Sequence, residues 1–338
     1  MRRRGGHRPP LQQLLSFSFT LFESRRSKLS RNLIIAADDF GLTHRVNEAI
    51  AIACRDGVVT SASLMVTGAG FDSAIDVARN EPNLDIGLHL NLTEGCPVAN
   101  PSRIPTLADA GGFLYKQPFK LASALFKRKV SLSDLEREVR AQIEKAVDSS
   151  LWITHIDGHK HVHVMPAVFR IIRRVAPEYG IFAARSIRER IPGIGSMLVR
   201  EKRSWRQILK QCAVGKLISA SSYVSQRGKM HADLVTPKCF YGIAQTGFLD
   251  LAAFTDIIRD LDDGNHELMC HPGFVDDDLN ITPTRLLAQR ERELKLLTGT
   301  EVRKLLDEAG VALISYRNLV ENYGNRRSNS ILHRYSAL

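Results

Sequence analysis

The sequence contains few cysteines, and none of them occurs in a paired motif. Its 338 residues include five, at Cys54, Cys96, Cys212, Cys239 and Cys270, and no CxxC spacing occurs. An odd number of scattered cysteines does not provide the disulfide framework that small secreted domains use. We therefore expect reduced thiols, which are typical of a cytoplasmic protein.

Long hydrophobic runs are also missing. No apolar stretch approaches the ~20 residues that a membrane-spanning helix needs. Residues 14–22 follow three arginines at 2–4, as in a secretory signal, but they lack a small-residue cleavage site and two arginines follow at 25–26. We predict that residues 1–30 are a basic, disordered extension and that residues 321–338 are a flexible C-terminal tail.

The body of the chain has little excess positive charge, although the formal net charge is +11. Residues 1–31 contain eight Lys and Arg against one Glu, and residues 326–338 contain three Arg and no acid. Inside the body, residues 185–238 contain twelve Lys and Arg against three acids. This distribution argues against a nucleic-acid-binding body. The basic segment can still face an anionic substrate or give peripheral contact with a membrane.

Short apolar runs alternate with helical patterns, and no internal repeat occurs. This alternation predicts an α/β fold with a parallel sheet, either open or closed into a β/α barrel, in a single domain over 31–320. The strands are expected at 33–37, 60–66, 85–90, 151–156, 181–185, 266–270 and 311–315. The helices are expected at 44–56, 71–80, 131–148, 166–176, 250–262 and 284–309, the last broken near Thr298 and Gly299.

Two insertions interrupt this alternation. Residues 94–130 are rich in Pro and Gly, and residues 186–245 are basic, with Trp205 and Tyr223. We expect the second insertion to be irregular. Long irregular segments of α/β proteins are often functional lids, and the alternative is a solvated excursion without a role.

Four of the eleven histidines lie in residues 155–163, directly after an apolar strand. On an extended chain His155, Asp157, His159, His161 and His163 would share one face, because side chains alternate with a period of two. One or two of them can reach a common metal ion. The others are then expected beside the metal ligands or facing the substrate.

Other polar residues end further predicted strands. Asp38 and Asp39 follow the first strand, where they either cap the next helix or divide metal binding and proton transfer between them. His89, Arg185 and His271 end three more strands. A lone histidine in an apolar strand is more often part of the core. Five polar clusters at the carboxyl ends of parallel strands instead predict an active site at that edge.

These motifs resemble the YdjC-like carbohydrate deacetylases, which include the chito-oligosaccharide deacetylase of bacteria. The resemblance extends from about residue 31 to 320 and depends on ADDFGL at 37–42, GVVTS at 57–61, GLHL at 87–90, HIDGHKHVH at 155–163 and MCHP at 269–272. It implies a distorted, TIM-like β/α barrel related to the polysaccharide deacetylases. It also implies a hydrolase that removes an N-acetyl group from an amino sugar and releases acetate.

The resemblance implies roles for individual residues. A divalent metal ion would be held by Asp39, His89 and His159. Asp38 would be the general base, and His271 would be the general acid. A general acid must be protonated at working pH, so we expect a pKa near neutrality or above for His271.

The sequence does not determine which metal ion is bound, but it suggests a partner for the general base. The family implies Mg²⁺, whereas two imidazoles and a carboxylate also suit Zn²⁺ or Fe²⁺. Arg185 is expected to keep Asp38 ionised and oriented, because a nearby cation favours a carboxylate.

The resemblance indicates a class of substrate and does not identify the individual substrate. An N-acetylglucosaminyl oligosaccharide or glycolipid fits, since some relatives act on N-acetylglucosaminyl lipids of hopanoid synthesis. Two other functions are considered: a non-haem Fe(II) oxygenase, which also uses two histidines and a carboxylate, and a catalytically silent barrel that binds a glycan or lipid. The oligomeric state, including a homodimer, is not determined by the sequence.

Overall fold

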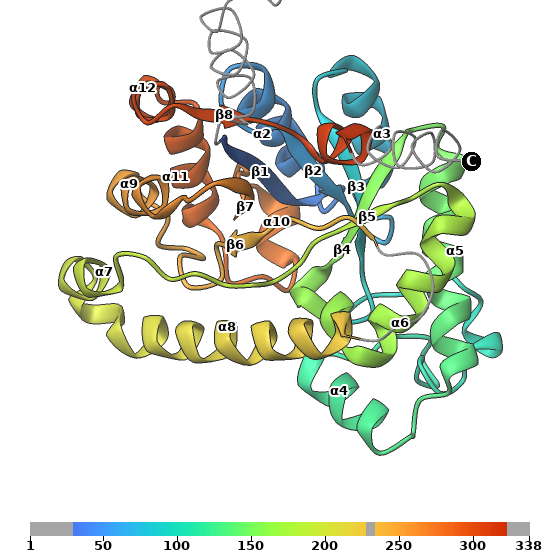
Figure 1. Cartoon of the computed structure of the whole chain (residues 1–338). Helices are drawn as coiled ribbons and strands as arrows, with labels where there is room; N and C mark the ends of the chain where they lie inside the picture. The colour runs from blue at the N-terminus through green and yellow to red at the C-terminus, as the bar shows by residue number, and fades with distance from the viewer. Residues whose placement is uncertain (1–29, 228–233, 323–338) are drawn as a thin grey trace, which may run out of the picture.

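The computed structural model describes residues 30–227 and 234–322 (Figure 1). The basic extension predicted for 1–30 and the tail predicted for 321–338 lie almost entirely outside the described residues. The strands are β1 (Arg31–Phe40), β2 (Ser61–Leu64), β3 (Asp85–Leu90), β4 (Ile153–Gly158), β5 (Ala183–Ala184), β6 (Cys239–Tyr241), β7 (Gly264–Cys270) and β8 (Val311–Leu313).

These strands form one parallel sheet in the order β5-β4-β3-β2-β1-β7-β6, and β8 pairs with the start of β1. The sheet curls into a half-barrel with helices around it (Figure 1). Backbone hydrogen bonds bridge the gap between its edges: Ala184 N–H donates to Val235 O and Arg190 N–H donates to Phe240 O, both at 3.0 Å. The predicted distorted β/α barrel is therefore confirmed.

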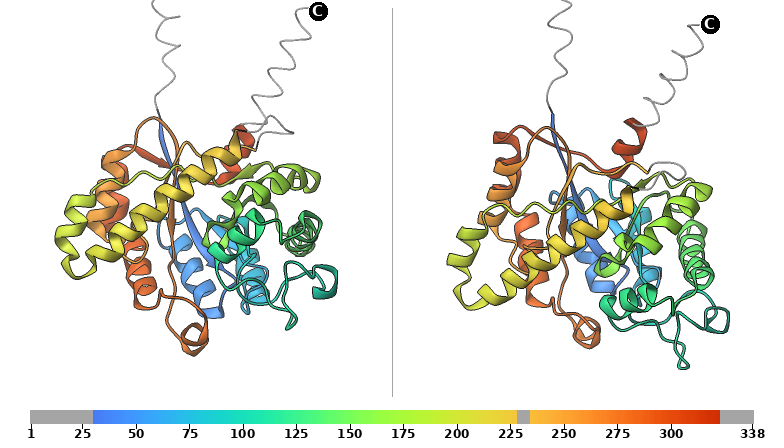
Figure 2. Two further views of the ribbon diagram at one scale, coloured as in Figure 1. Left: turned by 90° about the horizontal axis from the view of Figure 1, so that it is seen from below. Right: turned by 60° about the horizontal axis from the view of Figure 1, so that its bottom comes forward.

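The α-helices surround the sheet (Figures 1 and 2). They are α2 (His44–Arg55), α3 (Phe71–Asn80), α4 (Pro118–Phe126), α5 (Leu132–Asp148), α6 (Pro166–Val175), α7 (Ile194–Arg200), α8 (Trp205–Gln226), α9 (Leu251–Asp260), α10 (Asp277–Ile281), α11 (Ala288–Leu297) and α12 (Thr300–Glu308). Short 3-10 helices are η1 (Pro101–Arg103), η2 (His159–Val164), η3 (Ala176–Tyr179) and η4 (Lys202–Ser204). The expected break near Thr298 and Gly299 separates α11 from α12.

The first strand and helix show why the chain folds in this way. Residues 33–37 of β1 are all fully buried, as expected for a strand covered on both faces of a parallel sheet. The next helix, α2, begins after Thr43, whose side chain accepts a hydrogen bond from Val46 N–H. Asp38 and Asp39 are thereby held at the carboxyl end of β1, directly before the helix.

The expectation of an irregular segment over 186–245 is wrong. It contains α7, the 22-residue α8 and β6, which is a strand of the sheet. Apolar side chains lie on several sides of α8, including exposed Leu209, Leu217 and Val224. The single apolar stripe that normally reveals a surface helix is therefore missing.

The structure also bears on the cysteines and on the lack of long hydrophobic runs. All five cysteines are free, as predicted. Within 30–227 and 234–322, every helix is too short or too polar to cross a bilayer.

Candidate active site

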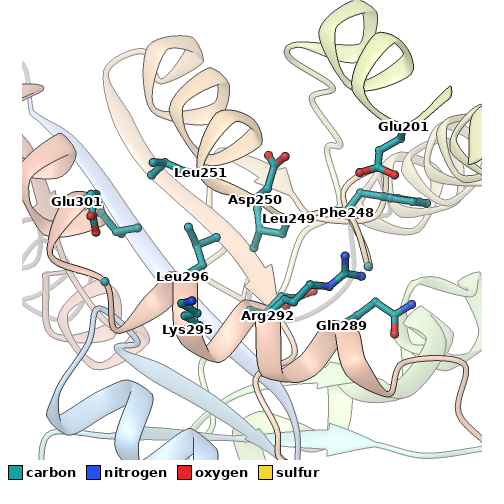
Figure 3. Close-up of a pocket in the computed structure, with 14 residues that line it drawn as sticks. Glu201, Phe248, Leu249, Asp250, Leu251, Gln289, Arg292, Lys295, Leu296 and Glu301 are labelled. Carbon is teal, nitrogen blue, oxygen red and sulfur yellow. The ribbon is translucent and has the colours of Figure 1, made fainter.

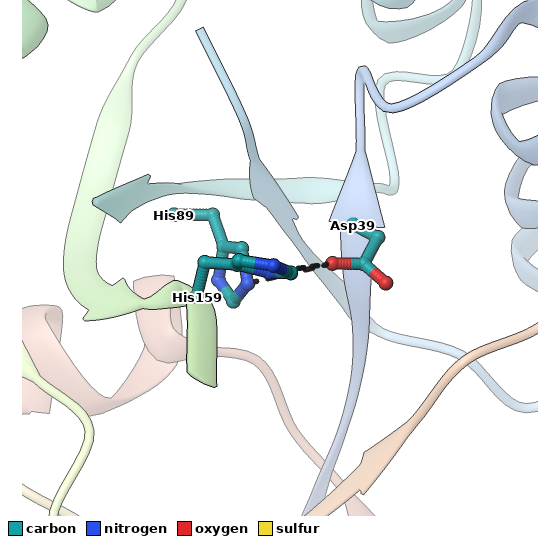
Figure 4. Close-up of side chains that lie close together, drawn as sticks. All are labelled: Asp39, His89 and His159. Atoms are coloured by element: carbon teal, nitrogen blue, oxygen red, sulfur yellow. Dashed lines mark hydrogen bonds and ion pairs between the residues drawn. The ribbon is translucent and has the colours of Figure 1, made fainter. Parts of the chain in front are cut away.

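The carboxyl ends of β1, β3 and β4 bring Asp39, His89 and His159 together, with their side chains pointing toward one another (Figure 4). One potential ligand atom from each side chain can be chosen so that all three lie within 4.8 Å of one another. His159 Nδ1 lies 3.1 Å from Asp39 Oδ1, and His89 Nε2 lies 3.7 Å from the same oxygen. A carboxylate and two imidazoles at this spacing form a group that could hold a metal ion.

The backbone of Asp39 explains how it can differ from its neighbour Asp38. Asp39 has φ 67°, in the left-handed region, and the pairing of β1 with β2 shifts register between Ala37 and Phe40. Such an irregularity turns a side chain away from the regular alternation of a strand. Gly41 follows with φ 93°, and a Cβ there would lie 2.8 Å from Met65 O.

Asp39 and His159 stabilise the charged forms of each other's side chains. Burial opposes ionisation of Asp39, but Arg290 and His159 hold its pKa well below the ordinary value. Burial also opposes protonation of His159, yet its hydrogen bonds to Asp39 and Glu94 raise its pKa to about 9. Asp39 is therefore held in the ionised form, which is the form of a carboxylate that binds a cation.

A second carboxylate fixes the orientation of His89. The Nδ1 atom of His89 donates to Asp157 Oδ1 at 2.8 Å, so that the Nε2 atom of His89 points toward Asp39. Asp157 in turn accepts a hydrogen bond from the Ser63 hydroxyl and pairs with Arg185 at 2.6 Å. A histidine held by a carboxylate through its other nitrogen is the usual arrangement of imidazole metal ligands.

Arg185 lies at the centre of the buried charges. Its side chain is fully buried and donates to both oxygens of Asp38, at 2.7 and 2.8 Å, in a bidentate pair. It also pairs with Asp157, and its Nε donates to Glu267 Oε1 at 2.8 Å. Burial would lower the pKa of Arg185, but the surrounding carboxylates hold it well above the ordinary value.

His271 borders the same cavity as the two aspartates, but its electrostatics differ from the expectation. Burial lowers its pKa to about 4, despite the nearby Asp39 and Asp38. The prediction of a pKa near neutrality or above is therefore wrong for this structure, since desolvation outweighs the two carboxylates. Its backbone N–H donates to Glu293 Oε2 at 2.6 Å, which fixes the position of the residue.

The shared face predicted for 155–163 is also wrong. The chain leaves the extended conformation after Gly158, because η2 follows and Lys160 and His161 have left-handed backbones. His161 lines the cavity, whereas His163 is fully buried.

His155 lies farther into the fold than the sequence suggested. Its ring stacks on Tyr316 at 3.7 Å between centroids. It also lies against Gly87, where a Cβ would come within 2.3 Å of the ring. Burial lowers its pKa to about 3, so it is neutral at ordinary pH and packs as a core side chain.

A cavity of about 1050 Å³ opens beside these groups. Asp38, Asp39, His89, His159 and His271 line one end of it. The remaining wall comes largely from α4 and α8 and from the loop before α11. A smaller pocket of about 290 Å³ lies between α11 and the segment that leads into α9 (Figure 3), and none of the site residues predicted from the sequence lines it.

A family model described as YdjC-like protein matches residues 32–308. The chain belongs to this family. A carbohydrate deacetylase from Brevibacillus brevis (strain 47) is 34% identical over 288 residues, which are 85% of this chain and 99% of that protein. A crystal structure from Enterococcus faecalis V583, named as a cellobiose-phosphate cleavage protein, has 27% identity and a TM-score of 0.67 over 86% of this chain and 99% of its own. The resemblance inferred from the motifs is confirmed.

Several charged residues of this YdjC-like chain were missed by the sequence reasoning. Arg290 on α11 is buried and donates to Asp39 Oδ2 at 2.6 Å. Glu293, on the same helix, holds the backbone of His271. Glu94 pairs with Lys160 at 2.5 Å and lies 3.7 Å from His159 Nε2. The signal available for Arg290 and Glu293 was their spacing of three, which places them on one helix face.

Proposed function

We propose that this enzyme removes the N-acetyl group from an amino sugar, as an N-acetylglucosaminyl oligosaccharide or glycolipid, and releases acetate. Its membership of the YdjC-like family and its similarity to a carbohydrate deacetylase support a deacetylase-type hydrolase. The observation that carries the proposal is the convergence of Asp39, His89 and His159 beside Asp38 and Arg185.

Asp39, His89 and His159 would hold the divalent metal ion. Two imidazoles suit Zn²⁺ or Fe²⁺ by ligand type, while Mg²⁺, which the family implies, prefers oxygen ligands. The hydrogen bond from His89 Nδ1 to Asp157 leaves Nε2 available as a ligand. The bound ion would polarise the amide carbonyl and activate a water molecule.

Asp38 would remove the proton of the attacking water. The bidentate pair with Arg185 fixes both carboxylate oxygens in direction. Arg185 itself acts through Asp38 and is therefore a positioning residue. General base catalysis of this kind contributes typically about 10²–10⁴-fold.

His271 would protonate the departing nitrogen, because an amine is a poor leaving group without a proton. Its pKa of about 4 makes it neutral in the free enzyme at pH 7. His271 would therefore gain its proton during the reaction. Asp38, which lines the same end of the cavity, would take this proton from water and pass it to His271.

The test measures acetate release by the purified full chain. Samples stripped with EDTA and samples reloaded with Mg²⁺ or Zn²⁺ would be incubated with N-acetylglucosaminyl oligosaccharides and with N-acetylglucosaminyl lipids. We expect release after reloading only, and equally in the absence of O₂, because hydrolysis consumes water alone. Full activity of the stripped enzyme, or dependence on O₂, would contradict the proposal.

A further inference from the structure

Two helices that border the cavity carry large apolar side chains that are exposed. On α4, Phe119 is 81% exposed and Phe126 is 89% exposed. On α8, Leu217 is 72% exposed and Val224 is 60% exposed. Neighbouring apolar residues exposed to this degree mark a surface that contacts another molecule or a membrane.

The same two helices carry positive charge and no negative charge. Residues 110–133, which contain α4, include five Lys and Arg and no acid. Residues 202–227, which contain α8, include six Lys and Arg and no acid. The basic residues alternate with the apolar ones, as at Phe126 with Lys127 and at Trp205 with Arg206. Apolar and cationic side chains mixed in this way are typical of segments that lie in the interface of an anionic bilayer.

The position of the helices connects this surface with the site. Phe119 of α4 and Lys210 and Leu217 of α8 line the cavity that contains the two aspartates. Figure 1 shows α4 and α8 at the lower side of the molecule, with α12 and β8 on the opposite side, and Figure 2 shows α8 extending along its outside. The surface therefore borders the cavity whose far end holds the site.

We propose that α4 and α8 form a docking surface for an anionic phospholipid bilayer, with the cavity opening toward the lipid. A protein partner fits less well, because protein interfaces are depleted of charged residues at their cores, and here cations adjoin the most exposed apolar side chains. The described helices are not suited to crossing a membrane, so the contact would be peripheral. Given the proposed function, an acetylated sugar with an apolar anchor could enter the cavity from the bilayer.

The experiment measures sedimentation of the full chain with phosphatidylcholine vesicles, with and without phosphatidylglycerol. We expect binding to the anionic vesicles that weakens as salt is raised. Reversing charge directly after α4 with Lys127→Glu and Lys129→Glu, or around the start of α8 with Arg203→Glu in η4 and Arg206→Glu, should weaken binding at least roughly tenfold. Phe126→Ser should also weaken it.

A matched control reverses two exposed charges elsewhere, with Arg79→Glu on α3 and Lys304→Glu on α12. The control matters because residues 1–29 contain seven Lys and Arg and could bind vesicles in every variant. Binding unchanged in the α4 and α8 variants, or equal binding to neutral vesicles, would overturn the docking surface. A change in oligomeric state in these variants alone would assign the surface to a second copy of the chain.

Acetate release from a soluble N-acetylglucosaminyl oligosaccharide separates this inference from the proposed function. None of the five residues substituted in or beside α4 and α8 lines the cavity, so their variants should retain that activity. Retained activity without vesicle binding in the unmodified chain would contradict only the docking surface. Vesicle binding without metal-dependent acetate release would contradict only the proposed function.

Discussion

Two adjacent aspartates at the end of β1 have different partners, and this difference is the main chemical feature of the site. Asp38 pairs with Arg185, whereas Asp39 contacts His159 and Arg290. The left-handed backbone of Asp39 turns its side chain away from the direction that a regular strand would give it. Neighbouring carboxylates can therefore take the roles of metal ligand and base.

The two aspartates should respond differently to the loss of charge. Asp38→Asn should keep bound metal and lose about 10²–10⁴-fold in kcat, because only the base is removed. Asp39→Asn should lose metal first, since a neutral amide is a poorer ligand than a carboxylate. Metal content by atomic absorption and acetate release would be measured on the same preparations. Equal metal loss in both variants would show that the division of roles is wrong.

His271 can be tested by varying the leaving group. His271→Ala should slow hydrolysis of an N-acetyl sugar by about 10²–10⁴-fold. Hydrolysis of nitrophenyl acetate should suffer much less, because nitrophenolate leaves without a proton. An equal fractional loss on both substrates would instead give His271 a role in binding or positioning.

At the scale of helices and strands, the strand ends could be predicted, and the helix that supports them could not. Apolar runs ending in Asp39 and His89 identify the site because parallel strands share one carboxyl edge. The α11 sequence AQRERELKLL instead has the composition of a solvated helix. The spacing of Arg290 and Glu293 places them on one helix face, but their burial depends on packing against the site, which local sequence does not encode.

Helix α11 would support the proposed metal site through Arg290, which donates a hydrogen bond to Asp39. Arg290→Gln should raise the pKa of Asp39, because Arg290 is the largest of the influences that lower it. Protons would then compete with the metal at higher pH, so the pH at which metal is lost should move upward. Affinity at neutral pH should fall by about 10–100-fold, as for other residues that support metal ligands.

Metal titration across a range of pH would test this expectation. Arg292→Gln is the matched control, because Arg292 is an exposed arginine of the same helix. An identical shift in both variants would assign the effect to the overall charge of α11.

At the scale of the whole molecule, buried neutral histidines should make the fold sensitive to acid. Burial lowers the pKa of His163 to about 3 from an ordinary 6.5. Between these values the unfolded chain binds a proton that the folded chain does not, so stability falls as pH decreases from 6.5 toward 3. Each such group contributes a slope of up to about 1.4 kcal/mol per pH unit.

His163→Leu should therefore flatten this dependence. Urea unfolding at pH 6.5 and 4.5 would measure it, with His44→Leu at the exposed start of α2 as the control. We expect the loss of unfolding free energy between the two pH values to be smaller in His163→Leu than in the unmodified protein. Indistinguishable losses in all three proteins would contradict a neutral, buried His163.

The central arginine also has a consequence for the order in which the chain folds. Arg185 is 147 residues from Asp38 and 82 residues from Glu267 in sequence. During synthesis, strands β1 to β4 emerge before it, and Asp38 and Asp157 then lack their buried counter-charge. A truncated chain that ends at Ala184 should consequently leave the carboxyl ends of its strands exposed to solvent. The reason is that Asp38 and Asp157, without Arg185, resist burial.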